Sequence, residues 1–158
     1  MPIPNIGAIL GSNIQIGGNK IETAVAKAYL TRHVNDFDRV EFNVGLGPGI
    51  ILGPDYADYV QRSATESTKL RADMILYLGD SATIVEVKGR ISGSVLGQLL
   101  TYWHMLTVDN PKLMQVYKVV AGNTIQDGLP AIFDRYGVTV ELYPAATPTA
   151  ATSPAPAA

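Results

Sequence analysis

Two acidic residues and one lysine lie where two neighbouring apolar segments of the chain could bring them together. Asp73 is at the start of one segment, and Glu86 and Lys88 are at the end of the next. Two carboxylates a few ångströms apart repel each other, and a shared divalent cation with oxygen ligands relieves that repulsion. A lysine beside such an ion can orient or help deprotonate an attacking water, and it can stabilise negative charge that develops on a phosphate. These residue types therefore predict metal-assisted hydrolysis of a phosphodiester.

The two segments are predicted to form a β-hairpin. Residues 72–78 and 82–87 are short apolar runs, and the Gly-Asp-Ser of residues 79–81 between them is typical of a turn. In an antiparallel pair, the side chains of one face recur at every second position, so a register with Asp73 opposite either the glutamate or the lysine puts all three charged groups on one face. Both registers fit the turn. The alternative is that the three groups are ordinary polar strand ends paired with their neighbours.

The remaining elements follow from the spacing of apolar residues. Residues 19–35 have the spacing of a helix with one buried stripe, and residues 39–46 alternate as a half-buried strand does. Residues 47–69 are rich in Gly, Pro, Ser and Thr, which indicates a functional flap or a connection with a short helix of its own. The later expected elements are a helix from Ser92 or Ser94 to about Thr107, a strand at 116–121, a helix at 129–136 and a strand at 138–143. The order αβββαβαβ predicts an α/β fold.

Composition limits the kinds of partner and cofactor. The chain has 158 residues, 47% of them hydrophobic and 16% charged, which suits one compact domain. Its formal charge of -2 gives no overall basic field, so a polyanion would have to be held by a local cluster of lysines and arginines. The absence of cysteine excludes disulfides, thiolate zinc sites and cysteine nucleophiles. With His33 and His104 far apart in the chain, an oxygen-liganded ion such as Mg²⁺ or Mn²⁺ is favoured.

The chain divides by composition into three parts. Residues 1–18 form an N-terminal arm, residues 19–143 form the domain, and residues 144–158 are almost wholly Ala, Pro and Thr. Such a tail cannot bury enough apolar surface to offset the entropy of ordering it, so we expect it to be flexible. The arm has neither a basic leader nor a long apolar block, so no signal peptide or membrane span is expected. We expect a cytoplasmic protein, located in the host cytoplasm or the virion if it is viral, with no membrane partner.

The hairpin and its charged residues resemble the PD-(D/E)XK nuclease superfamily. The core of that superfamily has an Asp on its second strand, a Glu-X-Lys on its third and then a helix packed on the sheet, which matches Asp73, Glu86-Val87-Lys88 and the element order above. The resemblance implies a restriction-endonuclease-like core, with a central mixed sheet flanked by helices. It also implies one or two Mg²⁺ or Mn²⁺ ions between Asp73, Glu86 and the backbone carbonyl of Val87, with Lys88 assisting cleavage.

The helix after the hairpin resembles the Gln-X-X-X-Tyr motif of RecB-like members. Gln98 and Tyr102 are one helical turn apart and share a face. The resemblance implies that the Gln98 amide holds a metal-bound water or a phosphate and that the Tyr102 phenol contacts the nucleic-acid backbone. The alternatives are a solvated Gln98 and an amphipathic core position for Tyr102. Gly97 costs the helix roughly 1 kcal/mol relative to alanine, which suggests close packing against the sheet or a ligand.

Two further acids are candidates for the metal site. Glu22 follows Asn19 at the spacing of a capping box, which would satisfy a backbone donor without touching a metal. In the Holliday-junction-resolvase branch of the superfamily, however, a glutamate on the first helix joins the metal site, so both roles stay open. The literal Pro54-Asp55 lies in a Gly-, Pro- and Tyr-rich stretch with no strand period, so Asp73 is preferred over Asp55.

The resemblance implies a divalent-metal-dependent nuclease that hydrolyses DNA. An endonuclease is favoured because a chain of 158 residues has no space for a helicase or a separate recognition domain. Arg71 and Arg90 flank the site in sequence and are expected to contact the substrate. The acidic balance suggests that a partner protein delivers the DNA, and a homodimer would place two centres on a duplex or a branched junction. In size the chain resembles junction resolvases, phage or mobile-element nucleases and repair nucleases.

Two rival functions remain at this point. In the first, a nuclease-like fold serves without catalysis as a structural or nucleic-acid-binding component of a virus particle or a multi-subunit complex, a role that suits the apolar arm and the Pro-Ala tail. In the second, the chain is an RNA-cleaving member of the same superfamily.

Overall fold

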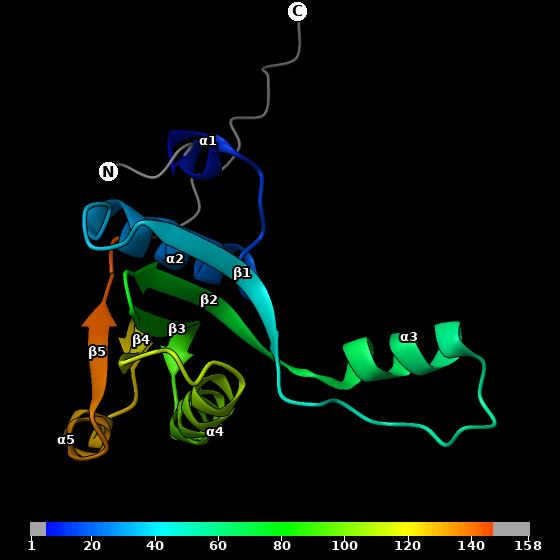
Figure 1. Ribbon diagram of the computed structural model, residues 1–158. Coiled ribbons are helices and arrows are strands. Elements are labelled where there is room, and N and C mark those ends of the chain that lie inside the picture. The colour runs from blue at the N-terminus through cyan, green and yellow to red at the C-terminus, as the bar shows by residue number, and fades with distance from the viewer. Residues whose placement is uncertain (1–5, 147–158) are drawn as a thin grey trace, which may run out of the picture.

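A five-stranded mixed sheet forms the centre of the protein (Figure 1). The computed structural model describes residues 6–146. The strands lie in the order of the chain, as β1 (Arg39–Leu46), β2 (Leu70–Leu78), β3 (Ser81–Ile91), β4 (Gln115–Ile125) and β5 (Val138–Leu142). The first three strands are antiparallel, whereas β4 and β5 run parallel to β3. The predicted α/β class, with a mixed sheet flanked by helices, is confirmed.

Helices cover both faces of this sheet. Helices α1 (Ile6–Gly11) and α2 (Lys20–Arg32) lie on one face, and α4 (Ser94–Asp109) and α5 (Leu129–Arg135) lie on the other (Figure 1). Each face has its own apolar core, one beneath α2 and one beneath α4 and α5. Because β2 and β3 are buried on both faces, their sequences are nearly continuous apolar runs rather than alternating ones.

The hairpin of β2 and β3 has a two-residue turn and opens at its far end. Gly79 takes up a left-handed φ of 54° in the turn, a conformation that glycine adopts without a steric penalty. Backbone pairing runs from Leu78 opposite Ser81 to Met74 opposite Val85 and stops there, although both strands continue. The two strands therefore separate next to Asp73.

The element order agrees with the prediction, with two helices added. The first predicted helix is α2, and its expected cap is confirmed, because the N–H of Glu22 donates to Asn19 Oδ1 at 2.9 Å. One added helix is α1, whose apolar side chains pack on the core beneath α2. The described part of the N-terminal arm is thus packed against the body. Residues 1–5 and 147–158, which include most of the predicted tail, lie outside the described residues.

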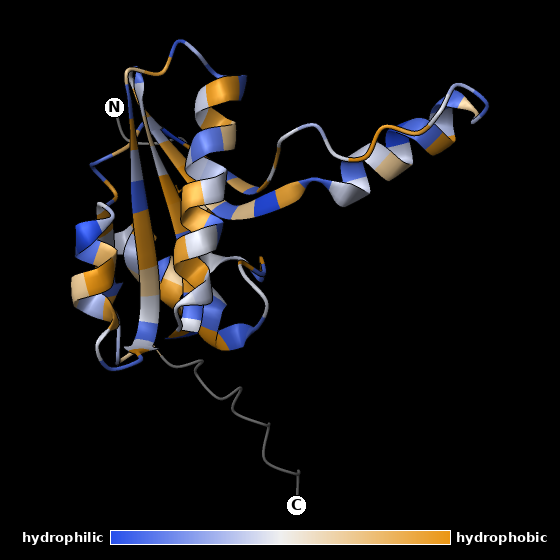
Figure 2. Ribbon diagram, turned by 90° about the horizontal axis from the view of Figure 1, so that it is seen from below, coloured by the Kyte–Doolittle hydropathy of each residue, from blue (hydrophilic) through white to orange (hydrophobic). Residues whose placement is uncertain are grey.

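The second added helix, α3 (Asp58–Thr68), belongs to an arm that projects from the sheet between β1 and β2 (Figures 1 and 2). Hydrogen bonds hold α3 to the loop before it, since Thr65 Oγ1 donates to the Ile50 carbonyl at 2.9 Å and the Ile50 N–H donates to Thr68 Oγ1 at 2.7 Å. Every residue of α3 is partly or fully exposed. Of the two alternatives for this region, the short helix is the one observed.

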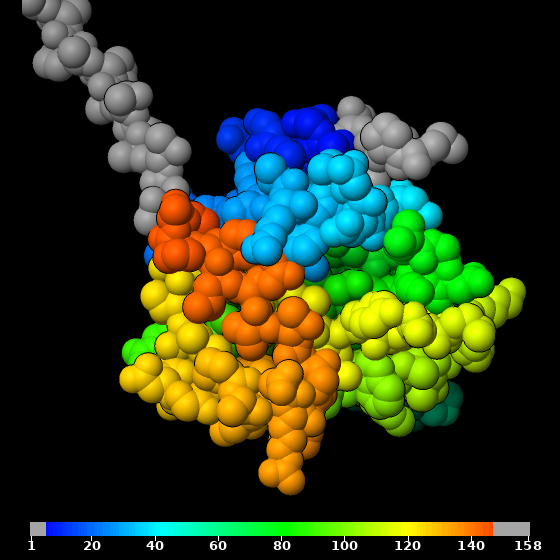
Figure 3. Space-filling view, turned by 90° about the vertical axis from the view of Figure 1, so that its left-hand side faces the viewer, coloured from blue at the N-terminus to red at the C-terminus, as the bar shows by residue number. Residues whose placement is uncertain are grey.

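A polar cluster ties the end of α2 to β5. His33 Nδ1 lies 2.7 Å from Asp36 Oδ2, and His33 Nε2 lies 2.9 Å from Glu141 Oε2. The hydroxyl of Tyr143 also donates to Glu141, at 2.6 Å. Figure 3 shows the segment after α2, in light blue, lying against the C-terminal part of the chain, in orange. Across residues 6–146, no helix is long and apolar enough to pass through a membrane.

Of the two explanations expected for Gly97, close packing against the sheet is wrong, and contact with a ligand stays a prediction. Gly97 is exposed on α4, and apart from the backbone of its own helix no described atom lies within 4 Å of the position that a Cβ would take. The cost of this glycine to the helix is therefore not offset by contact with the sheet.

Candidate functional site

Asp73 and Glu86 face each other where β2 and β3 separate. The N–H of Asp73 donates to Glu86 Oε1 at 3.4 Å, and the N–H of Val87 donates to Asp73 Oδ2 at 2.9 Å. Each carboxylate therefore accepts a hydrogen bond from the backbone of the opposite strand, in place of a carbonyl of a continued ladder. This contact extends the register in which Asp73 lies opposite Glu86, the first of the two registers expected from sequence.

Glu86 is a carboxyl group inside the protein. Only 1% of it is exposed. Burial and, to a smaller extent, the negative charge of Asp73 raise its pKa, Lys88 acts in the opposite direction, and the net pKa is about 7. A buried carboxylate next to a second carboxylate is costly in free energy, because it loses hydration and is repelled by its neighbour. Such a costly arrangement is frequent at functional sites.

Lys88 supplies the positive charge of the site. Its Nζ lies 3.1 Å from Glu86 Oε2, and a quarter of its side chain is exposed. Burial lowers the pKa of Lys88, but the charges of Glu86 and Asp73, with a smaller contribution from Glu22, raise it overall. The lysine is therefore held in its charged form, which suits it to stabilise negative charge rather than to accept a proton.

Helix α4 brings Tyr102 and Gln98 to the same side of the sheet. Tyr102 is 5% exposed and belongs to the core beneath α4, so the core position considered from sequence is confirmed. Burial raises the pKa of its phenol, and the charges of Glu86 and Asp73 raise it further. The Gln98 side chain, which is a hydrogen-bonding neighbour of the hydroxyl, lowers the pKa of the same phenol. The tyrosine is thus both a core residue and a wall of the site.

Glu22 caps α2 and also lies near the site. Its Oε2 accepts a hydrogen bond from the N–H of Gly18, in addition to the backbone bond to Asn19 described above. Its charge is one of the contributions that raise the pKa of Lys88, which shows that the first turn of α2 approaches the end of the Glu-Val-Lys segment. The structure shows the cap, and a role for Glu22 as metal ligand stays a prediction.

The expected substrate-binding arginines differ in their surroundings. The guanidinium of Arg71 donates to the backbone carbonyls of Asn43 and Glu66 at 3.0 Å each, so it joins β1 to the end of α3. Arg90 is exposed near the end of β3. Asp55, the acid of the literal Pro-Asp pair, is exposed in the loop that leads to α3.

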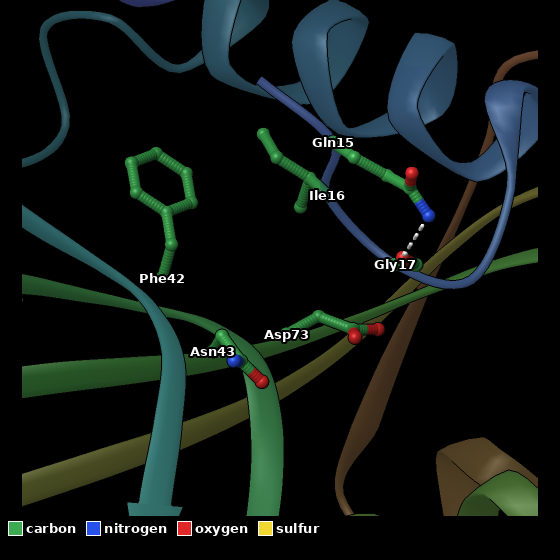
Figure 4. A pocket seen from close by; sticks show the side chains of 6 residues that line it. All are labelled: Gln15, Ile16, Gly17, Phe42, Asn43 and Asp73. Atoms are coloured by element: carbon green, nitrogen blue, oxygen red, sulfur yellow. Dashed lines mark hydrogen bonds between the residues drawn. The ribbon is translucent and has the colours of Figure 1, made fainter.

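A pocket of about 220 Å³ opens beside Asp73 (Figure 4). Three segments line it, namely the connection between α1 and α2, β1 and β2. Its lining residues are Gln15, Ile16, Gly17, Phe42, Asn43 and Asp73. The first five were not predicted from the sequence. Asn43, for example, was interpreted as the solvent side of an alternating strand, and its left-handed φ of 50° was not predicted.

The oxygen donors at the site suit a hard cation. Asp73, Glu86 and the carbonyl of Val87 offer two carboxylates and one carbonyl, and magnesium commonly takes one or two carboxylates together with water and substrate phosphates. Within residues 6–146 no group of three or more His, Cys, Asp or Glu side chains could hold a metal ion. The donor set is therefore a pair of acids, with Lys88 beside them.

Comparisons of the chain with protein-family models, with curated proteins and with solved structures found no match.

Proposed function

We propose that this chain is a divalent-metal-dependent nuclease of the PD-(D/E)XK type, which hydrolyses phosphodiester bonds of DNA as an endonuclease. The observation that carries the proposal is the meeting of Asp73 and Glu86 at the point where β2 and β3 separate, with the ammonium group of Lys88 3.1 Å from Glu86. A buried glutamate that faces a partly exposed aspartate, with a lysine beside it, is a poor way to stabilise a fold and a good way to hold a cation and a phosphate together.

The element order supports the same assignment. Helix α2, strands β1 to β3, helix α4 and strand β4 follow one another as in a restriction-endonuclease-like core, and α4 lies on the sheet face that carries Glu86 and Lys88. The Tyr102 phenol on this helix is close enough to Glu86 and Asp73 for their charges to raise its pKa, and the Gln98 side chain is a neighbour of that phenol. A separate motif on a separate element thus points to the same site.

In the proposed mechanism, Asp73, Glu86 and the carbonyl of Val87 would hold Mg²⁺ or Mn²⁺. The ion, when bound, supplies polarisation of the phosphoryl oxygen and a lowered pKa for water. Lys88 stabilises the negative charge that develops on the phosphate, because the two carboxylates keep it protonated. Tyr102 closes the inner wall of the site, and Gln98 offers an amide at its edge.

Nicking of a supercoiled plasmid by the purified protein tests this proposal. We expect cleavage with Mg²⁺ or Mn²⁺ and none with EDTA. Asp73→Asn and Lys88→Ala should each reduce the rate by on the order of 10²-fold or more, the usual effect of removing a group that stabilises the transition state. Asp55→Asn and Lys69→Ala are the matched controls and should cleave as the wild type does. The first removes an exposed acid of the arm, and the second removes a partly exposed lysine that pairs with Glu66.

Each other outcome points to a different function. Equal nicking by the wild type, Asp73→Asn and Lys88→Ala would reject the assigned site. Cleavage of RNA but not of DNA would favour the RNA-cleaving alternative. No metal-dependent cleavage of any nucleic acid would leave the non-catalytic structural role as the better account.

A further inference from the structure

We infer that the pocket beside Asp73 is a subsite for a single unstacked nucleobase, next to the phosphate that is cleaved. This inference rests on the proposed nuclease function and adds to it the state of the substrate at the cleavage point. Such a pocket would make the enzyme select DNA in which a base is unpaired or can leave the stack.

The position of the pocket is the first argument. Asp73 is both a member of the acidic pair and a lining residue, so a group in the pocket lies next to the reacting phosphate. Figure 4 shows the Asp73 carboxylate and the Asn43 amide on the side of the sheet, with Gln15, Ile16 and Gly17 lying over them.

Charge is the second argument, because none of the residues that line the pocket is a lysine, arginine or histidine that could hold a phosphate there. Asp73 is the charged residue among the lining residues, and it is acidic. The sugar-phosphate backbone therefore belongs at Lys88, and what enters the pocket from the same nucleotide has to be a neutral group. The neutral groups of a nucleotide are its sugar and its base, and of these the base is the planar group that an aromatic wall can stack on.

Size is the third argument. The volume of about 220 Å³ lies below the roughly 300–1,000 Å³ of pockets that take drug-sized ligands. A single planar ring system fits this space and a base pair does not. The segment around Gly17, which forms one rim of the pocket, packs closely against α2 and β3. A Cβ at Gly17 would lie 2.8 Å from side-chain atoms of Glu22 and 2.9 Å from a side-chain atom of Val87.

The chemistry of the walls is the fourth argument. Phe42 offers an aromatic face and Ile16 an apolar one, and enzymes that draw a base out of a duplex hold it by stacking between such side chains. The amides of Gln15 and Asn43 can each donate to and accept from the edge of a base. Asn43 is held with a left-handed φ of 50°, a conformation that costs free energy and is concentrated at functional sites.

The experiment uses DNA that carries one 2-aminopurine, placed in turn at each position around the mapped cleavage site. Fluorescence of 2-aminopurine rises when the base leaves the stack. With the Lys88→Ala protein, which binds without cutting under the proposed function, we expect a rise at one position adjacent to the cleaved bond. Replacing the base at that position by an abasic site should reduce kcat/KM of the wild type roughly 5- to 100-fold, the size expected for one base–aromatic stack.

Variants of the pocket provide the matched comparison. Phe42→Leu should show the same loss on normal DNA and no further loss on abasic DNA, whereas Phe42→Tyr keeps the ring and should retain activity. Asn43→Gly removes the amide, suits the left-handed φ, and should reduce the preference among bases at that position. Tyr136→Leu, an exposed aromatic residue at the end of α5, is the control and should be unchanged. If Phe42→Leu does not fold, Gln15→Ala and Asn43→Gly carry the test, since both residues are exposed.

Two results would overturn the inference, and they can be told apart. If the protein cleaves DNA but no position shows a rise in fluorescence and the abasic substitution has no effect, the subsite is rejected and the nuclease stands. If the protein neither binds nor cleaves nucleic acid, the proposed function fails and the subsite fails with it.

Discussion

Glu86 shows how the site and the stability of the fold oppose each other at a single residue. Its carboxyl group is 1% exposed and lies next to a second carboxylate, and its pKa is raised to about 7. Above that pH the group has to be ionised inside the protein, which costs free energy that an apolar or neutral side chain would not cost. A residue kept only for stability would not be an acid at this position.

The first prediction concerns Glu86→Gln in protein freed of metal with EDTA. The raised pKa means that the folded state binds the proton more tightly than the unfolded state, so stability of the wild type falls as pH rises from about 4.5 to about 7. The glutamine has no such cost. We expect it to raise the free energy of unfolding by about 1 to 3 kcal/mol at pH 8, by the conversion of about 1.4 kcal/mol per pKa unit, and by little at pH 5. Urea denaturation at the two pH values measures this.

Glu66→Gln is the control for that prediction. Glu66 is another acid beside a lysine, but it is exposed, and its pKa is lowered by its hydrogen bond with Lys69. Its replacement should not raise stability at pH 8. A Glu86→Gln protein that is less stable than the wild type at pH 8 would show that the pair with Lys88 outweighs the burial of the acid.

At the scale of elements, the opening of the β2–β3 hairpin creates the site. Pairing stops at Met74 opposite Val85, and beyond this point the Asp73 and Glu86 carboxylates accept the N–H groups that a ladder would have used. The backbone donors of the separated strands are therefore satisfied while the acids are brought together. A ladder continued through Asp73 would place backbone carbonyls where the acids now lie.

The tie between α2 and β5 gives a second prediction, on the pH dependence of stability. Burial lowers the pKa of His33, but its hydrogen bonds and charge interactions with Glu141 and Asp36 raise it overall. The stabilisation from protonated His33 is therefore complete below its unfolded pKa of about 6.5 and is lost as pH rises through the raised folded value. His33→Gln should lower the free energy of unfolding by about 1 to 2 kcal/mol at pH 6 and by less at pH 8.5.

Denaturation of His104→Gln provides the comparison. This is the second of the two histidines, and it is exposed on α4. Its replacement should change stability little at either pH. A loss in His33→Gln that is the same at pH 6 and pH 8.5 would mean that the histidine acts by packing against Tyr29 rather than by charge.

The sequence was informative where periodicity or a local rule decides the structure. The alternating residues of β1 and the Asn19–Glu22 cap follow from local physics, and the short turn before Ser81 restricted the hairpin to two registers. The choice between those registers depends on contacts across the sheet. The close approach of residues 15–17 to Asp73 joins segments far apart in the chain, so no local pattern could reveal the pocket. The close packing expected at Gly97 is not found, because a glycine that costs a helix free energy need not have a packing reason.

At the scale of the whole molecule, the absence of a net positive charge means that binding of a polyanion would depend on local groups. The formal charge is -2, so no long-range field draws DNA to the protein. Under the proposed function, the groups that would meet a phosphate are Lys88 in the site and Arg90 on the same strand. The projecting arm with α3 carries the exposed Tyr56 and Tyr59, which could stack on bases if the arm closes over a strand. The expectation that a partner protein delivers the DNA stays a prediction.

The central claim is that Asp73 and Glu86 together hold one divalent cation, and titration of the protein with Mn²⁺, followed by electron paramagnetic resonance of the free ion, tests it most directly. We predict that the wild type and Asp55→Asn bind Mn²⁺ with equal affinity, and that Asp73→Asn and Glu86→Gln each weaken binding by about tenfold or more, the usual effect of removing one ligand or its close support. Equal Mn²⁺ affinity in the wild type, Asp73→Asn and Glu86→Gln would contradict the claim.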